Sequence, residues 1–279
     1  HRRGGPHLLP FDAEELIRAA LPRPLDTDTR AADAEFLMAH GYHMGGAYWA
    51  AMAGDVTVRA QPKGSWFFDR EPAFTVTGPS ALVSWLEPLA LQLHYRIQIA
   101  TLAKLGTPEA LAKAVATVSC DAQRDIVLQT LAAVGVTAPP ITINADGYHA
   151  HVLTRVSEIV DIIKDPGRLF EVGMRAATCM DQHRIALEAC RSAGVRATSN
   201  VALAQTLRMT PVGTMGHEHV QRFGSDSEAF RAMRDRHPGP TSFLLDTFST
   251  VHSGLPTAFE LVAEDPSRGD TMRFDRDGL

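Results

Sequence analysis

Along residues 168–279, short apolar runs alternate regularly with longer amphipathic stretches. The apolar runs predict strands at residues 168–174, 194–197, 209–212, 242–245 and 271–274. The stretches between them predict helices at residues 181–192, 201–207, 225–236 and 256–264. Strands and helices that alternate with short loops are typical of parallel strands joined by right-handed crossovers. Five such units without a Gly-x-Gly-x-x-Gly sequence favour an α/β fold with a parallel β/α barrel over a dinucleotide-binding sheet.

The first 105 residues follow a different pattern. Asp12, with Glu15 three residues later, predicts a capping box for a short helix that ends near Leu21. A second helical pattern covers residues 30–40, and a long amphipathic helix is predicted over residues 80–105. Between them the apolar period becomes two, which predicts short antiparallel strands at residues 55–59, 65–68 and 73–77. Residues 1–105 are therefore expected to form a smaller α+β domain.

The middle of the chain is predicted to be mostly helical. Thr107 precedes Pro108 in the arrangement of an N-cap followed by proline at the first helical position. Two prolines at 139 and 140 interrupt the helical stretch. We therefore expect three parts, an α+β domain at 1–105, a helical insertion at 106–167 and a barrel portion carrying the active site at 168–279.

Composition and charge narrow the class of protein. The chain has 279 residues, of which 45% are hydrophobic, and a formal net charge of -5. The negative charge implies no general affinity for nucleic acid or for anionic membranes. No apolar run approaches the roughly 20 residues needed to span a bilayer. Three cysteines, Cys120, Cys179 and Cys190, form no close pairing motif, which predicts a reducing, cytoplasmic setting and buried thiols.

Three consecutive strand ends carry side chains with chemistry. The strand at 209–212 leads into Gly213-Thr214 and then His217, the next apolar strand leads into Asp246, and the last into Asp275. Barrels place their chemistry at the carboxyl ends of their strands. A histidine there can act as acid, base, nucleophile or metal ligand near neutral pH. We therefore expect a candidate site containing one histidine and two aspartates.

Other interpretations of these residues remain open. His217 and His219 would point to one face if the segment were extended, and with Glu218 they would form a metal-ligand pair. No other histidine cluster at ligand spacing accompanies them, which weighs against a metal site. A structural histidine bonded to a backbone carbonyl is a further alternative, and Asp246 and Asp275 would also serve as plain helix caps.

Two further segments suggest anion binding. Arg175 follows Gly173 at the end of a predicted strand, where a guanidinium would hold a phosphate or carboxylate bidentately. The alternative is an ordinary surface arginine. Thr198 and Ser199 precede a predicted helix, where their hydroxyls would cap it or its free amides would bind an anion.

Five segments in this order resemble motifs of the nicotinate phosphoribosyltransferase family and, more distantly, of nicotinamide phosphoribosyltransferase. The segments are EVGMRAATC, ATSN, PVGTMGHEHVQ, LLDTFSTVHSGLP and MRFD. Upstream, GSWFFDREPAFTVTGPSALVSWLEPLALQLHYRIQIAT is similar to another stretch of the family. The resemblance covers roughly residues 55–105 and 168–275.

The resemblance implies a reaction, a fold and partners. The family joins nicotinate to 5-phosphoribosyl 1-diphosphate in NAD biosynthesis, with coupled ATP hydrolysis through a phospho-histidine. It implies an irregular, partial parallel β/α barrel of the type II phosphoribosyltransferase kind with a second, partly β domain, and an active site formed in a homodimer. ATP and Mg²⁺ are the implied cofactors. The magnesium ion is expected to bind through the diphosphate, and an oxygen of Asp275 is the one candidate for a direct protein ligand.

The resemblance also implies roles for individual residues. His217 corresponds to the histidine that is phosphorylated from ATP, and Asp275 to the carboxylate that faces the ribose. Substrate-binding roles are implied for Arg175, Thr198, Ser199, Arg273, Asp246 and Ser249. The nicotinamide enzyme has an aspartate at the position of Ser199, and its charge would repel a carboxylate on the base. A neutral hydroxyl at Ser199 therefore suits a base that carries a carboxylate.

The chain departs from the family pattern at several positions. Val172 replaces the aromatic residue that stacks on the pyridine ring, and Ser249 replaces the second aspartate of D-T-Y-D. The family's N-terminal tyrosine segment and its glycine-rich phosphate loops have no match. A catalytically silent or truncated paralogue acting as a binding protein is therefore one alternative. A metal-dependent barrel hydrolase using His217, His219 and Asp275 is another.

Overall fold

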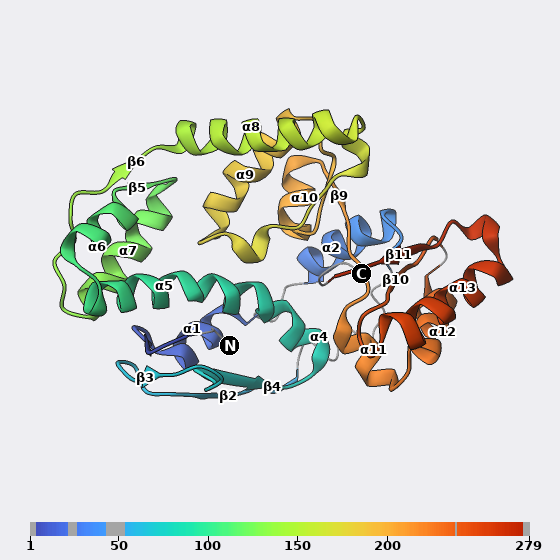
Figure 1. Ribbon diagram of the computed structural model, residues 1–279, viewed down its shortest axis with the longest axis horizontal. Coiled ribbons are helices and arrows are strands. Elements are labelled where there is room, and N and C mark those ends of the chain that lie inside the picture. The colour runs from blue at the N-terminus through green and yellow to red at the C-terminus, as the bar shows by residue number, and fades with distance from the viewer. Residues whose placement is uncertain (1–3, 22–26, 43–53, 238, 276–279) are drawn as a thin grey trace. The chain divides into compact units, whose positions relative to one another are not determined.

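The computed structural model describes residues 4–21, 27–42, 54–237 and 239–275 (Figure 1). The chain divides into two compact units, one of His1–Arg30 and Gly45–Pro211 and one of Ala31–Met44 and Val212–Leu279. Both predicted boundaries, after residues 105 and 167, fall inside the first unit. The division into three parts remains a prediction.

The first unit begins with two antiparallel strand pairs against helices. Strands β2 (Thr57–Ala60) and β4 (Phe74–Thr77) pair with each other, as expected. Strand β3 (Trp66–Phe67) instead pairs with β1 (His7–Leu8), a strand that the sequence pattern did not predict. β1 has only two residues, which is too short to produce a periodic signal.

Helix α1 (Ala13–Ala20) confirms the predicted capping box. The Asp12 carboxylate accepts the backbone N–H of Glu15 at 3.0 Å. The buried side chains of Leu9, Phe67 and Leu93 then pack the strands and the chain leading into α1 against the long helix of this unit. This burial supplies the main apolar contact between the two kinds of element.

A mostly helical region follows. It contains α4 (Ser80–Val83), the 3₁₀ turn η1 (Ser84–Leu86), α5 (Glu87–Leu105), α6 (Pro108–Val115), α7 (Asp121–Ala133) and α8 (Ala145–Ile163). The Thr107 hydroxyl accepts the N–H of Ala110 at 3.2 Å, which confirms the predicted N-cap of α6. Two strands, β5 (Thr117–Val118) and β6 (Thr142–Ile143), pair in parallel and were not predicted.

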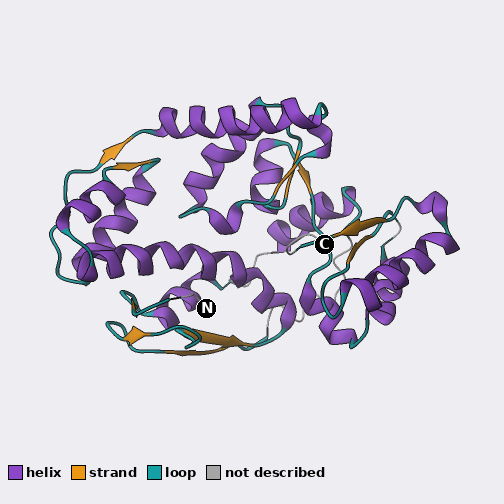
Figure 2. Ribbon diagram, viewed as in Figure 1, coloured by secondary structure: helices purple, strands orange, loops and turns teal. Residues whose placement is uncertain are grey.

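The last part of the first unit is a parallel sheet with the order β7-β8-β9. Its strands are β7 (Phe170–Glu171), β8 (Ala197–Thr198) and β9 (Thr210–Pro211). The 3₁₀ turn η2 (Pro166–Arg168) precedes β7. Between the strands lie the 3₁₀ turn η3 (Met174–Ala176) and the helices α9 (Met180–Ser192) and α10 (Val201–Leu207). Figure 2 shows this alternation of short strands and helices, which confirms the predicted β/α order of the segment.

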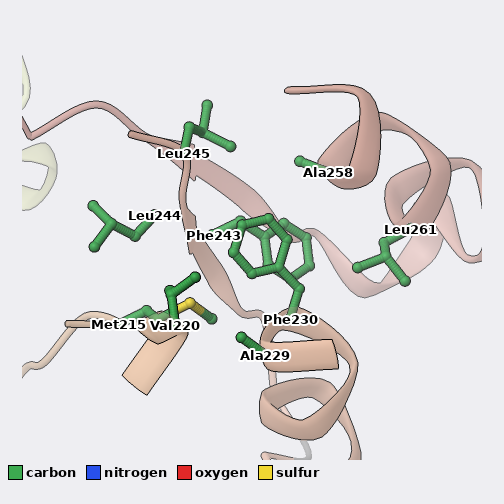
Figure 3. Packing of buried hydrophobic residues seen from close by; sticks show 9 residues of the cluster. All are labelled: Met215, Val220, Ala229, Phe230, Phe243, Leu244, Leu245, Ala258 and Leu261. Carbon is green, nitrogen blue, oxygen red and sulfur yellow. The ribbon is translucent and has the colours of Figure 1, made fainter. Parts of the chain in front are cut away.

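The second unit also contains parallel strands connected through helices, but only two such strands among its described residues. Besides the residues of α2 (Thr27–Ala39) from Ala31 onward, it contains α11 (His217–Phe223), α12 (Asp226–Arg236), β10 (Ser242–Leu244), the π-helical turn η4 (Thr250–Gly254), α13 (Leu255–Glu264), the 3₁₀ turn η5 (Pro266–Arg268) and β11 (Thr271–Arg273). β10 and β11 pair in parallel. Their core is dominated by Phe230 and Phe243, which are fully buried and stack with ring centroids 4.8 Å apart (Figure 3).

These observations confirm the α/β class and the parallel pairing of the predicted strands. They do not confirm a barrel, because the sheets within the described ranges have two or three strands and none closes on itself. Among the described helices, none combines the length and the apolar character required to cross a membrane.

Candidate functional site

The carboxyl ends of β10 and β11 form one edge of the second unit. The pairing continues one residue beyond β10, where the N–H of Leu245 donates to the carbonyl of Arg273 at 3.1 Å. Asp246 follows directly on one strand, and Asp275 follows two residues after the end of the other. Because the strands are parallel, both carboxylates lie at the same edge.

His217 lies between these two carboxylates. Its Nε2 is 3.3 Å from Asp246 Oδ1, and its Nδ1 is 4.0 Å from Asp275 Oδ2. The histidine side chain is 28% exposed and that of Asp246 only 12%. The expected grouping of one histidine with two aspartates is therefore present, and the ring is open enough for a substrate to reach it.

Arg273 completes the cluster. Its guanidinium bonds the carboxylate of Asp275 and the hydroxyl of Thr214, and it also donates to the carbonyl of Met215 at 3.4 Å. It thereby ties the end of β11 to the loop that leads into α11. A carboxylate beside an imidazole fixes which ring nitrogen carries the proton and leaves the other nitrogen as a nucleophile. A neighbouring guanidinium suits phosphate oxygens.

The extended arrangement of His217 and His219, on which the metal-ligand alternative depends, is not present. Both residues lie in helix α11, where side chains two positions apart point in nearly opposite directions. The Nε2 of His219 is 2.9 Å from the carbonyl of Ala229, and its ring packs on Phe223. Glu218 pairs with Arg222 at 3.2 Å. The ligand pair on which the metal-dependent hydrolase alternative rests is thus not formed. Among the residues described, no three His, Cys, Asp or Glu side chains are grouped to hold a metal ion.

The turn after Asp246 is fixed by three local contacts. Ser249 Oγ accepts the N–H of His252 at 3.3 Å, so this residue caps the π-helical turn. The hydroxyl of Ser253 donates to the buried carboxylate of Asp226, whose pKa is raised by burial. Gly254 lies so close to the strand end that a Cβ there would overlap the carbonyl of Leu245. Asp226 could not be singled out from the sequence, because it looks like an ordinary acidic residue in the first turn of a helix.

The opposite edge of the same strand pair has a structural role. The side chain of Asp270 is fully buried and lies 3.1 Å from Arg234 and 3.3 Å from Arg268. It also accepts the N–H of Thr241 at 2.7 Å. Asp270 and Thr241 immediately precede β11 and β10, so this ion cluster joins the amino ends of the two strands.

In the first unit, a buried hydrogen-bond network occupies the ends of β7 and β8. Glu171 Oε1 is 3.0 Å from His183 Nε2, and Glu171 Oε2 accepts the hydroxyl of Thr198 at 2.7 Å. The Nδ2 of Asn200 lies 2.9 Å from His183 Nδ1, which fits an amide donating to this nitrogen and Nε2–H donating to the carboxylate. Burial opposes ionisation of Glu171, but these bonds, with that from Gly173 N–H, hold its pKa below the ordinary value. His183 was not singled out from the sequence, where it is one of 12 histidines.

The segment after β7 differs from the predicted strand. The strand ends at Glu171, and Gly173 lies beyond it. A Cβ at Gly173 would meet Glu171 Oε1 at 2.7 Å, so the glycine permits this close bond. Arg175 lies on the turn η3, is 62% exposed, and is 3.3 Å from Glu87. It is therefore accessible to an anion. Val172 beside it is also 62% exposed.

Capping of α10 and the other roles expected of the residues before this helix fall to different side chains. The cap of α10 is Asn200, whose Oδ1 accepts the N–H of Leu203 at 3.1 Å, so the prediction that a hydroxyl caps this helix is wrong. Thr198 is fully buried, and its hydroxyl is occupied by Glu171. Ser199 is half-buried, and its N–H donates to the carbonyl of Glu171 at 2.9 Å. Its hydroxyl is the more accessible of the two.

Comparison with known proteins confirms the family resemblance. No protein-family model matches the chain. Over 132 residues it is 31% identical to nicotinate phosphoribosyltransferase from Bacillus subtilis strain 168, a match that covers 47% of this chain and 26% of that protein. The fold is similar to nicotinate phosphoribosyltransferases of known structure from Vibrio cholerae and Porphyromonas gingivalis.

The Vibrio enzyme gives a TM-score of 0.57 at 15% identity and covers 96% of this chain and 57% of that one. The Porphyromonas enzyme gives a TM-score of 0.54 at 18% identity and covers 96% of this chain and 61% of that one. At these identities the structural likeness concerns the fold. The chain spans between a quarter and two thirds of the length of these relatives.

Proposed function

We propose that this chain acts in NAD biosynthesis as a nicotinate phosphoribosyltransferase, joining nicotinate to 5-phosphoribosyl 1-diphosphate with coupled ATP hydrolysis. The observation that carries the proposal is the position of His217 between Asp246 and Asp275, with Arg273 on the second carboxylate. This grouping lies at the carboxyl edge of parallel strands, where α/β proteins bind their substrates. The likeness to the Bacillus protein supports the same assignment.

His217 is the proposed phosphoryl acceptor. Asp246 Oδ1 is closer to Nε2 than Asp275 Oδ2 is to Nδ1, so the Nε2 nitrogen carries the proton in our proposal. The lone pair of Nδ1 then attacks the γ-phosphorus of ATP. A P–N bond forms, the bond from the γ-phosphorus to the bridging oxygen breaks, and ADP leaves with the electron pair. Arg273, bonded to the carboxylate nearest Nδ1, offsets part of the added negative charge.

The phosphoribosyl step forms a bond from the pyridine nitrogen to the anomeric carbon and breaks the bond from that carbon to the diphosphate oxygen. Positive charge develops on the ribose ring as the diphosphate leaves, and the ionised carboxylate of Asp275 is placed to stabilise it. When bound, Mg²⁺ supplies charge neutralisation of the diphosphate. The carboxylate oxygens of Asp275 are of the hard donor type that this ion accepts.

Arg175 and Ser199 are the proposed contacts for the base. The guanidinium of Arg175 is exposed and pairs only loosely with Glu87, so a nicotinate carboxylate can replace that partner. Thr198 holds Glu171 in place beneath this segment and is assigned a positioning role. Ser249 is assigned the same kind of role, because it caps the turn that follows Asp246. The absence of an aromatic side chain at Val172 predicts weak binding of the base.

The resemblance also leads us to propose a homodimer in the cytoplasm. Light scattering on the purified protein measures the mass of the assembly and so tests the dimer directly. A mass of twice 30.3 kDa supports the dimer, and a mass of 30.3 kDa at assay concentration contradicts it.

The reaction is tested by incubating the protein with nicotinate, 5-phosphoribosyl 1-diphosphate, ATP and Mg²⁺, and measuring nicotinate mononucleotide. We expect product with the wild type, at least a hundredfold less with His217→Ala, and wild-type rates with His219→Ala, because His219 faces away from the cluster. No product from correctly folded wild type, by circular dichroism, overturns the proposal in favour of a catalytically silent relative.

A further inference from the structure

Two cysteines that are far apart in the sequence touch in the first unit. The Sγ atoms of Cys120 and Cys179 are 3.7 Å apart across a separation of 59 residues. Both thiols are free and half-buried. Each cysteine is the N-cap residue of a 13-residue helix, Cys120 of α7 and Cys179 of α9. The two helix starts therefore meet at a pair of thiols.

Matching hydrogen bonds hold the two thiols in place. Gln123 Oε1 accepts both the N–H and the hydroxyl of Ser119 at 2.8 Å. In α9, Gln182 Oε1 accepts the N–H of Thr178 at 2.7 Å and its hydroxyl at 2.9 Å. Each cysteine thus lies directly after the hydroxyl residue of a Ser/Thr-Cys-x-x-Gln sequence. On both sides of the sulfur contact, a glutamine side chain therefore holds the backbone just before the cysteine through the same pair of hydrogen bonds.

A further hydrogen bond joins the two glutamines. The Nε2 of Gln182 donates to Gln123 Oε1 at 3.4 Å, and both glutamines are buried. The proximity of the thiols consequently follows from the main-chain arrangement and from side chains other than their own. The sulfur atoms, now 3.7 Å apart, have to approach to about 2.04 Å to form a disulfide.

A cavity lies next to the residues that flank the pair. Its volume is about 260 Å³, and its lining includes Ser119, which precedes Cys120, and the glutamines Gln123 and Gln182. Tyr148 and Asn144 line it from the start of α8. The two sulfur atoms themselves are half-buried and do not line this cavity.

We propose that Cys120 and Cys179 form a dithiol modification site that closes to an intramolecular disulfide by exchange with a small-molecule disulfide. In the first step, the thiolate of one cysteine attacks a sulfur of the reagent, forming a mixed disulfide and releasing one small thiolate. In the second, the other cysteine loses its proton and attacks the protein sulfur of that mixed disulfide, expelling the second small thiolate. The two thiol protons end on the two released thiolates, and the reagent is reduced while the protein is oxidised.

The third cysteine provides an internal control. Cys190 is buried, and burial together with the charge of Glu171 raises its pKa to about 11. It is therefore expected to stay reduced. Burial also raises the pKa of Cys179, aided by the neighbouring Cys120, so exchange is expected to accelerate as the pH rises from 7 to 9.

The test uses reduced full chain incubated with oxidised glutathione, quenched in acid, denatured and alkylated with N-ethylmaleimide. Intact mass is expected to show alkylation falling from three groups directly to one, with a Cys120–Cys179 peptide in a non-reducing digest. Cys190→Ser is expected to behave like the wild type, with alkylation falling from two groups to none. Three alkylated groups at saturating reagent, or a persistent glutathione adduct in the wild type, overturns the proposal.

A second measurement does not depend on oxidation. Phenylarsine oxide binds two close thiols as a cyclic dithioarsinite with release of water. We expect one equivalent to bind to the wild type and to Cys190→Ser, and none to bind stably to Cys120→Ser or Cys179→Ser. Equal binding by all four proteins would contradict the pairing, even if one of the substitutions changed the exchange kinetics.

Discussion

Replacing Asp270 by asparagine removes the charge at the centre of the buried ion cluster of the second unit. The side chain of Asp270 is fully buried, while those of Arg234 and Arg268 are 11% and 19% exposed. Asparagine has the same shape, and its amide oxygen can still accept the N–H of Thr241. The substitution therefore isolates the charge. It leaves two largely desolvated guanidiniums without their shared carboxylate.

The expected loss follows from the cost of an unpaired buried charge. Removing one partner of a buried pair costs about 3 to 5 kcal/mol, compared with about 0 to 1 kcal/mol for an exposed pair. Arg234 also lies 3.5 Å from Glu264, which retains part of its compensation. We therefore expect about 3 kcal/mol, which is a large fraction of the roughly 5 to 15 kcal/mol that stabilises a typical domain.

The assay is urea unfolding at pH 7, followed by hydrogen exchange of the amides of β10 and β11. Exchange reports the second unit specifically, because the two units need not unfold together. Asp235→Asn, on the exposed side of the same helix, is the matched control and is expected to change the free energy by less than about 0.5 kcal/mol. A loss below about 1 kcal/mol for Asp270→Asn, with the m-value unchanged, would refute the argument that this cluster joins the strands.

Three further predictions concern stability. Gly254→Ala should cost about 1 to 3 kcal/mol in urea unfolding, because the added Cβ overlaps the carbonyl of Leu245, whereas Gly213→Ala should be nearly neutral because no atom lies within 4 Å of its Cβ; equal effects would contradict the close approach. The folded pKa of Glu171 lies below its unfolded value, so its contribution is complete above about pH 4.3 and is lost as the pH falls through the folded pKa. Unfolding between pH 6 and pH 3 should thus be less pH-dependent in Glu171→Gln than in the wild type or in the exposed control Glu158→Gln, and parallel curves for all three would reject the assignment. Closing the 59-residue loop between Cys120 and Cys179 should stabilise the oxidised protein by at most about 4 kcal/mol, seen as a higher Tm that a reductant reverses; a lower Tm on oxidation would show that the bond strains the fold.

The pattern of apolar runs was sufficient to predict the candidate site of the second unit. Parallel strands bring their carboxyl ends to one edge, so His217, Asp246 and Asp275 could be grouped without knowing any contact between them. The direction of the histidines was not predictable in the same way. Helix α11 has seven residues, and its N-cap residue is Gly216, which offers no capping side chain, so no cap signal separated the helix from an extended segment.

Contacts between distant residues left weaker signals. The network of Glu171, His183 and Asn200 depends on the register of β7 and β8 and on one face of α9, which single-residue patterns do not specify. The pair of cysteines does have a signal in the sequence, because Ser/Thr-Cys-x-x-Gln occurs around both of them, but this repeat is only five residues long. Its meaning requires the glutamine bonds that the structure reveals. The prediction that all three thiols are buried was correct only for Cys190, because Cys120 and Cys179 are half-buried.

The most direct test of the central claim is phosphorylation of His217. Wild type, His217→Ala and His219→Ala are incubated with γ-labelled ATP and Mg²⁺, and the label on the protein is tested for acid lability and located by peptide mapping. We expect acid-labile, alkali-stable label at His217 in the wild type and in His219→Ala, and none in His217→Ala. Folded wild-type protein without label, or label that persists in His217→Ala, would contradict it.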